Sequence, residues 1–208
     1  MTEKCYFESD ALEISSLITS CYEENGRTIA ILNRTVFHPQ GGGQPSDTGW
    51  IGASRVLHVH QDDMEILHII ESPVAIGRSD TRVDAARRNH HARLHTAGHL
   101  IGNIGILFGY TPIKAHHWPG ESKVTFKADS SQSTIAISDF ANMTTKLIAE
   151  DLTRYVEMTL GIRCIGFGYL PSFPCGGTHV ARLSDIGQIY ISSVITKKGN
   201  LSVHYEVI

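Results

Sequence analysis

Two histidine-containing motifs constrain this chain more than any other feature, because together they offer four ligands to one metal ion. His95 and His99 are four residues apart, and Cys175 and His179 repeat that spacing far downstream. Three imidazoles and one thiolate are the nitrogen and sulfur donors that Zn²⁺ prefers in tetrahedral sites. The chain is therefore predicted to fold so that these two distant segments meet at one metal site.

The spacing has a different structural basis in each motif. On an α-helix, residues i and i+4 lie on one face with Cβ atoms about 5–6 Å apart. The proline-free segment around the first two histidines predicts a helix over residues 87–108. Pro174, Gly176 and Gly177 exclude a regular helix around the second motif, so its cysteine and histidine are expected on a tight loop.

Residues that are missing from the motifs argue against two kinds of zinc site, the protease kind and the purely structural kind. A zincin protease needs Glu directly after the first histidine as general base, and Thr96 occupies that position. A purely structural zinc site typically has more cysteines, often as CxxC, and the sequence contains no CxxC. Either the four ligands fill every position on the ion, or one is labile and leaves room for water; the spacing leaves both alternatives open.

Composition favours a cytoplasmic protein. The N-terminus has no apolar run behind a basic start, as a signal peptide would have. No stretch approaches the roughly 18 apolar residues of a membrane span, so no membrane partner is expected. The four cysteines are scattered rather than arranged as a disulfide framework. A net charge of −3 argues against a non-specific nucleic-acid binder, although specific binding needs only a local basic patch.

The chain is expected to divide near residue 85. Short β-branched or alternating segments in the first part predict strands, and polar turns between them predict hairpins. A small β-barrel over residues 1–85 is the expected result. The predicted strands are 28–32, 55–60 and 65–70, with hairpin connections at 23–26 and 61–63.

The second part, residues 86–208, alternates helical and extended patterns and predicts an α+β layer. After the helix that carries the first motif, a second helix is expected over residues 139–160, because its apolar residues approximate one face and Gly161 follows as a stop. The predicted strands are 122–127, 134–138, 163–169, 187–195 and 201–207.

Several motifs in combination carry a resemblance to a known family. HTAGHL at residues 95–100, PCGGTHV at 174–180 and DIGQI at 185–189 resemble the editing domain of alanyl-tRNA synthetases. They are still more similar to its free-standing relatives, the AlaX proteins. FHPQGGGQPSDTG at 37–49 is similar to the glycine-rich motif that precedes the editing domain in longer AlaX forms. The resemblance thus extends over nearly the whole chain.

This resemblance implies a fold, an activity and a cofactor. The fold is a small N-terminal β-barrel followed by a threonyl/alanyl-tRNA synthetase-like editing domain with a mixed sheet and helices. The activity is hydrolysis of mischarged tRNA(Ala), most often Ser-tRNA(Ala) and sometimes Gly-tRNA(Ala). The partner is the acceptor end of tRNA(Ala), and the protein is expected to be a monomer or homodimer. One Zn²⁺ per chain is implied, with the ligands His95, His99, Cys175 and His179.

The substrate contacts depart from the family pattern at one position. Gly98 stands where many synthetase editing domains have Thr, so serine selectivity cannot be carried over through that residue. The candidates for the polar contact are Thr96, Thr178 and the His116-His117 region. For the RNA, Arg87, Arg88 and Arg93 cluster at the ligand helix and Lys114 lies downstream; the alternative is a solvated helix face with ion pairs.

The glycine-rich segment and the catalytic step leave alternatives open. The segment lacks Gly-Lys-Ser/Thr and a dinucleotide fingerprint, so no nucleotide cofactor is expected. It is either a turn-forming loop or a cover over the substrate cleft or acceptor end. No carboxylate stands out as a general base, and zinc either activates water or positions the substrate. Two other functions compete with editing: a zinc-stabilised tRNA-binding adaptor without hydrolysis, and another small metallohydrolase.

Overall fold

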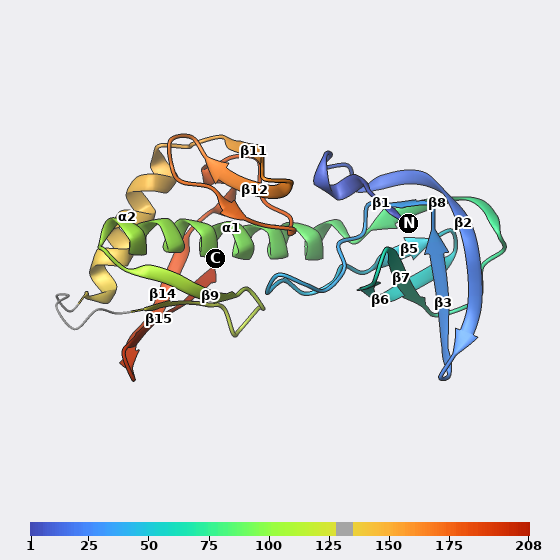
Figure 1. Ribbon diagram of the computed structural model, residues 1–208, viewed down its shortest axis with the longest axis horizontal. Helices are drawn as coiled ribbons and strands as arrows, with labels where there is room; N and C mark the ends of the chain where they lie inside the picture. Colours follow the sequence, from blue (N-terminus) through green and yellow to red (C-terminus); the bar gives the residue numbers. More distant parts are fainter. Residues whose placement is uncertain (128–134) are drawn as a thin grey trace. The chain divides into compact units, whose positions relative to one another are not determined.

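The computed structural model describes residues 1–127 and 135–208, and it combines helices with several sheets (Figure 1). Contacts divide the chain into two compact units. The glycine-rich segment is shared between them, so that three of its residues belong with the motif histidines. The first unit is Met1–Gly41 with Pro45–Asn89, and the second is Gly42–Gln44 with His90–Ile208.

Six strands of the first unit pair in a closed ring, in the order β2-β3-β7-β6-β5-β8. Every pairing in the ring is antiparallel. The ring strands are β2 (Glu13–Glu24), β3 (Arg27–Leu32), β5 (Gly49–Ile51), β6 (Ser54–Asp62), β7 (Glu65–Ile70) and β8 (Gly77–Val83). The same unit contains β1 (Glu3–Lys4), the 3₁₀ turn η1 (Cys5–Phe7) and β4 (Arg34–Thr35), and β1 pairs with β4 in parallel.

The three strands predicted in this unit are confirmed as β3, β6 and β7. The β2–β3 hairpin turns at Asn25 and Gly26, whose φ angles of 51° and 72° match the two positive φ angles of a type I′ turn. Apolar residues of the ring strands, together with Phe37 from the segment after β4, form one buried cluster. It includes Ile18, Ala30, Leu32, Phe37, Ile51, Val56, Val59, Ile66, Ile70 and Val83.

The helix predicted for the first motif is confirmed as α1 (Ala85–Leu107). Asp84 caps its start, because the Asp84 side chain accepts a hydrogen bond of 3.1 Å from the Arg87 amide. Gly109 ends it with a φ of 86°. The buried apolar residues of α1 belong to the core of the second unit; they are Ala92, Leu94, Ala97, Leu100, Ile101 and Ile104.

The described residues of the second unit form two sheets. A four-stranded sheet has the order β14-β15-β10-β9, and a three-stranded sheet has the order β11-β12-β13. The predicted strands at 122–127, 163–169, 187–195 and 201–207 are confirmed as β10, β12, β14 and β15. The elements are β9 (Thr111–His116), β10 (Lys123–Lys127), α2 (Ile137–Ala149), β11 (Arg154–Thr159), β12 (Ile162–Phe167), β13 (Phe173–Pro174), η2 (Leu183–Ile186), β14 (Ile189–Lys197) and β15 (Asn200–Val207).

The predicted helix over 139–160 is wrong beyond Ala149, where α2 ends. Asp151 takes a left-handed φ of 51°, and its side chain accepts hydrogen bonds from Arg182 Nε at 2.7 Å and the Ser184 amide at 3.1 Å. The chain then returns as β11, which pairs with β12. Gly161 is the second residue of the tight turn between these strands and not a helix stop.

Other predictions for the secondary structure need correction. Of the strand predicted at 134–138, residue 134 lies outside the described residues, and Ile137 already begins α2. The sequence pattern also missed β2, β8 and β9. In β8, Arg78, Asp80 and Arg82 are exposed between buried or half-buried residues, so this strand has one solvated face and lacks the apolar run that predicts a strand. Neither helix in the described ranges is long and apolar enough to cross a membrane.

Candidate metal centre

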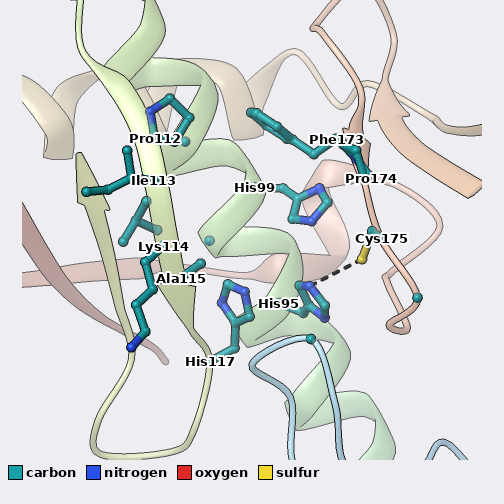
Figure 2. Close-up of a pocket in the computed structure, with 15 residues that line it drawn as sticks. His95, His99, Pro112, Ile113, Lys114, Ala115, His117, Phe173, Pro174 and Cys175 are labelled. Carbon is teal, nitrogen blue, oxygen red and sulfur yellow. Dashed lines mark hydrogen bonds between the residues drawn. The ribbon is translucent and has the colours of Figure 1, made fainter. Parts of the chain in front are cut away.

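The structure brings the four residues of the two motifs together. His95 and His99 come from α1, and Cys175 and His179 come from the loop after β13. One ligand atom from each residue lies within 4.8 Å of the others. Cys175 Sγ is 3.4 Å from His95 Nε2 and 3.2 Å from His179 Nε2. Figure 2 shows His95, His99 and Cys175 turned toward one another.

The loop that carries Cys175 is held by hydrogen bonds from the backbone and the side chain of Arg163. The Cys175 amide donates to Arg163 O at 2.9 Å, and Arg163 Nη1 donates back to the carbonyls of Cys175 and Gly177 at 2.9 and 3.1 Å. Gly177 allows the loop to approach α1, since a Cβ there would lie 2.2 Å from His95 Cε1. A side chain at 177 would therefore displace the imidazole from the centre.

Hydrogen bonds from outside the cluster orient two of the imidazoles. Gln44 Oε1 accepts from the Thr178 amide at 3.0 Å and lies 2.7 Å from His95 Nδ1. Because this oxygen can only accept, His95 carries its proton on Nδ1 and directs the Nε2 lone pair toward Cys175. Thr96 Oγ1 lies 3.1 Å from His179 Nδ1. Such partners commonly fix the orientation of metal-binding histidines.

The electrostatics of the centre suit a bound cation. Burial lowers the pKa of His99 to about 4 and the pKa of His179 well below its usual value, so these imidazoles are neutral and their lone pairs are available. Burial also raises the pKa of the Cys175 thiol to about 11. A buried thiolate needs a positive partner, and a divalent ion bound by the three imidazoles would supply one. The donor set therefore fits Zn²⁺.

A cavity of about 420 Å³ opens beside this centre. One wall is β9 and the other is the segment around Phe173 and Pro174, with α1 between them (Figure 2). Its size suits a small ligand group. The lining residues are Gly42, His95, Gly98, His99, Gly102, Pro112, Ile113, Lys114, Ala115, His117, Val124, Phe173, Pro174, Cys175 and Gly176.

The candidate substrate-binding residues do not all lie at the cavity. Gly98 lines the cavity. Thr96 and Thr178 are buried and do not line it; Thr96 bonds His179, and Thr178 Oγ1 accepts from Gln44 Nε2 at 2.9 Å. His116 is also absent from the lining, and its Nε2 lies 3.5 Å from a Glu121 carboxylate oxygen. Of the four candidate substrate-binding residues, only Gly98 lines the cavity.

The four residues predicted to bind RNA differ in their burial and in their hydrogen-bond partners. Arg88 is buried in an ion pair with Asp47, which lies in the glycine-rich segment. Arg87 Nε donates to Ser46 O at 3.1 Å, and Arg93 Nε donates to Ile186 O at 2.8 Å. These three guanidinium groups already hold the backbone of their own units. The Lys114 side chain is exposed at the cavity and makes no ion pair or hydrogen bond within the described ranges.

The sequence motifs did not single out two residues of the site. Gln44 lies inside the glycine-rich segment that was singled out, but nothing in its spacing indicates a contact with His95. His117 was named only as part of a region, and it lines the cavity where His116 does not. Burial lowers the pKa of His117 to about 3, and its ring stacks on His95 with centroids 4.2 Å apart.

Gln44→Ala is expected to lower zinc affinity about 10–100-fold, the usual effect of losing a partner that orients a metal-binding histidine. Gln44→Glu is the matched control, because it keeps an acceptor oxygen for His95 Nδ1 and should retain most of the affinity. Competition with a chromophoric zinc chelator measures both variants. Parental affinity in Gln44→Ala would show that the Gln44–His95 contact does not orient the ligand.

Comparison with known proteins gives relatives along nearly the whole chain. No protein-family model matches. An alanyl-tRNA editing protein AlaX-L from Pyrococcus horikoshii is 24% identical over 97% of this chain and 56% of its own length. An alanyl-tRNA editing protein Aarsd1 from Mus musculus is 29% identical over 95% of the chain and 56% of its own length.

An alanine–tRNA ligase from Methanothermobacter thermautotrophicus is 29% identical over 90% of the chain, but only 24% of that enzyme is covered. The chain thus spans about half the length of the editing proteins it matches and about a quarter of the ligase. The resemblance found in the motifs is confirmed: the chain is related to alanyl-tRNA editing proteins of the AlaX type.

Proposed function

We propose that this chain is an aminoacyl-tRNA deacylase that hydrolyses mischarged tRNA(Ala). Ser-tRNA(Ala) is the first candidate substrate, and Gly-tRNA(Ala) is the second. The observation that carries the proposal is the convergence of His95, His99, Cys175 and His179 at the wall of one cavity. The similarity to alanyl-tRNA editing proteins supports the same reaction class. In that reaction, water cleaves the ester between the amino acid and the terminal ribose.

One Zn²⁺ per chain is proposed for the centre, with His95, His99, Cys175 and His179 as ligands. When bound, Zn²⁺ supplies positive charge that polarises a carbonyl oxygen or acidifies water. The residues around it hold the ligands in place: Gln44 orients His95, Thr96 orients His179, and Gly177 leaves space for the His95 ring. The site is thus organised by groups that do not themselves meet the substrate.

The cavity residues have a different role, which is to position the aminoacyl ester. Phe173 and Pro174 on one wall and Pro112 and Ile113 on the other give the cavity apolar surfaces against which the ester can pack. An aminoacyl ester is already reactive, so orientation of the ester and of one water contributes a large part of the acceleration. Lys114 at the cavity supplies the exposed cation for the acceptor-end phosphates.

The proposed domain organisation follows the resemblance. The first part, residues 1–85, would be a small β-barrel domain built on the closed ring of strands. The second part, residues 86–208, would be the editing domain that contains the zinc centre. A thiolate ligand suits a reducing compartment, and we propose the cytoplasm as the place of action.

A deacylation panel tests this function. The zinc-loaded chain is incubated with Ser-, Gly- and Ala-tRNA(Ala), and with Ser-tRNA(Ala) that carries a mutated acceptor stem. Fast loss of Ser-tRNA(Ala) beside stable Ala-tRNA(Ala) is the expected result, and the rate for Gly-tRNA(Ala) measures the selectivity between the two mischarged substrates. Binding of tRNA without any hydrolysis would contradict the proposal and leave an adaptor role. Cleavage of free aminoacyl esters independent of tRNA would instead identify another small metallohydrolase.

A further inference from the structure

His117 occupies the part of the cavity that a side chain at position 98 would otherwise fill. A Cβ built at Gly98 would lie 2.3 Å from His117 Cε1 and 2.6 Å from the Tyr205 hydroxyl oxygen. The His117 imidazole therefore fits in this position only because residue 98 has no side chain. Figure 2 shows His117 beside His95 at the cavity.

A chain of hydrogen bonds determines which nitrogen of His117 carries the proton. The Tyr205 hydroxyl lies 3.0 Å from Leu94 O and 2.6 Å from His117 Nδ1. A carbonyl oxygen only accepts, so both contacts are hydrogen bonds only when the single hydroxyl proton of Tyr205 is donated to Leu94 O. The Tyr205 oxygen must then accept from His117, which places a proton on Nδ1. In the neutral imidazole, Nε2 keeps a lone pair and acts as an acceptor.

The buried position of this network makes its geometry rigid. His117 and Tyr205 are each 1% exposed, and the His117 amide is held by Gly43 O at 2.9 Å. His117 Nε2 has no hydrogen-bond partner within residues 1–127 and 135–208. The structure thus presents a preorganised acceptor that its own described residues leave unused.

The remainder of the cavity offers no comparable side-chain acceptor. Apart from the proposed metal ligands, the polar side chains lining it are those of Lys114 and His117, in the part of the chain that the structure describes. The ammonium of Lys114 only donates, and Lys114 is exposed on β9. A hydroxyl group that enters the cavity therefore finds its side-chain acceptor at His117.

We propose that His117 Nε2 accepts a hydrogen bond from the side-chain hydroxyl of the seryl group, and that His117 thereby makes the site select serine over glycine and alanine. The inference rests on the proposed function for its substrate. Glycine and alanine offer no hydroxyl, and their binding leaves the buried acceptor unpaired, which costs affinity. A site built to bind a hydroxyl in this way discriminates strongly against analogues that lack it.

Two substitutions of His117 separate the functions of its two nitrogens. Asn places an amide near the position of Nδ1 and keeps a contact with Tyr205, but it does not reach the position of Nε2. Gln reaches the position of Nε2. In His117→Asn, the ratio of kcat/KM for Ser-tRNA(Ala) to that for Gly-tRNA(Ala) is expected to fall at least about tenfold. His117→Gln is expected to recover part of that ratio.

His204→Asn is the matched control. His204 precedes Tyr205 on β15, and successive side chains on a strand point to opposite faces. It does not line the cavity, and its substitution should leave the ratio at the parental value. If His117→Asn lowers the two rates by the same factor, His117 contacts a group common to both substrates, such as the α-ammonium, and the proposal is overturned.

A binding measurement separates failure of this proposal from failure of the proposed function. Calorimetry with non-hydrolysable 3′-seryl and 3′-glycyl amides of adenosine reports recognition without turnover. Tighter binding of the seryl amide that is lost in His117→Asn would uphold the role of His117 even in a chain that hydrolyses nothing. Equal affinity for the two amides in the parental chain would overturn it, whether or not deacylation occurs.

Discussion

Cys175→Ala is expected to lose bound zinc and deacylation of Ser-tRNA(Ala) together. Cys175 is the only sulfur donor among the four candidate ligands, and its Sγ lies within 3.4 Å of two imidazole nitrogens. Removal of a partner that only orients a ligand costs about 10–100-fold, so loss of a direct ligand should lower activity by more than about 100-fold. Zinc content by mass spectrometry and initial deacylation rates measure the two effects.

Cys164→Ala is the control for the loss of a thiol in the same unit. Cys164 is buried on β12, in register with Pro174 of β13, and it is not one of the four clustered ligands. This variant should retain zinc and most of the activity despite a small packing defect. Full activity of Cys175→Ala, with zinc still bound, would refute the assigned centre.

Asp47→Ala is expected to destabilise the chain by about 3–5 kcal/mol, the typical effect of breaking a buried ion pair by removing one partner. Asp47 is fully buried and Arg88 is 6% exposed. The Asp47 carboxylate also accepts from the His38 amide at 2.6 Å, and Arg88 Nη2 donates to Val36 O at 2.6 Å. Without Asp47, the Arg88 guanidinium remains buried with its charge uncompensated. Urea unfolding followed by circular dichroism measures the loss.

The double variant Asp47→Leu with Arg88→Met tests whether the loss arises from the unpaired charge. It removes both charges and keeps apolar volume, so its free energy of unfolding should lie closer to the parental value than that of Asp47→Ala. Asp47→Ala and a single Arg88→Met variant together distinguish the two roles considered for Arg88. An Asp47→Ala chain with parental stability, combined with an Arg88→Met chain that is stable but loses tRNA affinity, would favour the RNA-binding role.

The secondary structure could be predicted where local signals were strong. The helix that carries His95 and His99 has a capping Asp84, no proline and a terminating Gly109, all of which act within a few residues. The segment after Ala149 could not be predicted in this way. Its apolar spacing resembles a helix, but the segment forms a hairpin with β12 across Leu160 and Gly161, and strand preference depends on packing context that the local pattern does not contain.

The basic cluster shows the same difference at the level of single side chains. Arg87, Arg88 and Arg93 are near one another in sequence, which suggested a surface for RNA. Each guanidinium is instead engaged by a carboxylate or a carbonyl that comes from a different part of the chain. Burial of Arg88 depends on Asp47, and no property of the helix sequence itself indicates that partner.

The sequence by itself determined the four clustered donors of the candidate centre. Donor chemistry belongs to residue type, and the i, i+4 spacing of His95 and His99 already places them on one helix face. Only the tertiary structure decided what surrounds those donors. Gln44 reaches His95, and His117 fills the space that Gly98 leaves open and is anchored by Tyr205. These contacts join segments that are distant in sequence, and they arise only when the core packs, so spacing along the chain does not encode them.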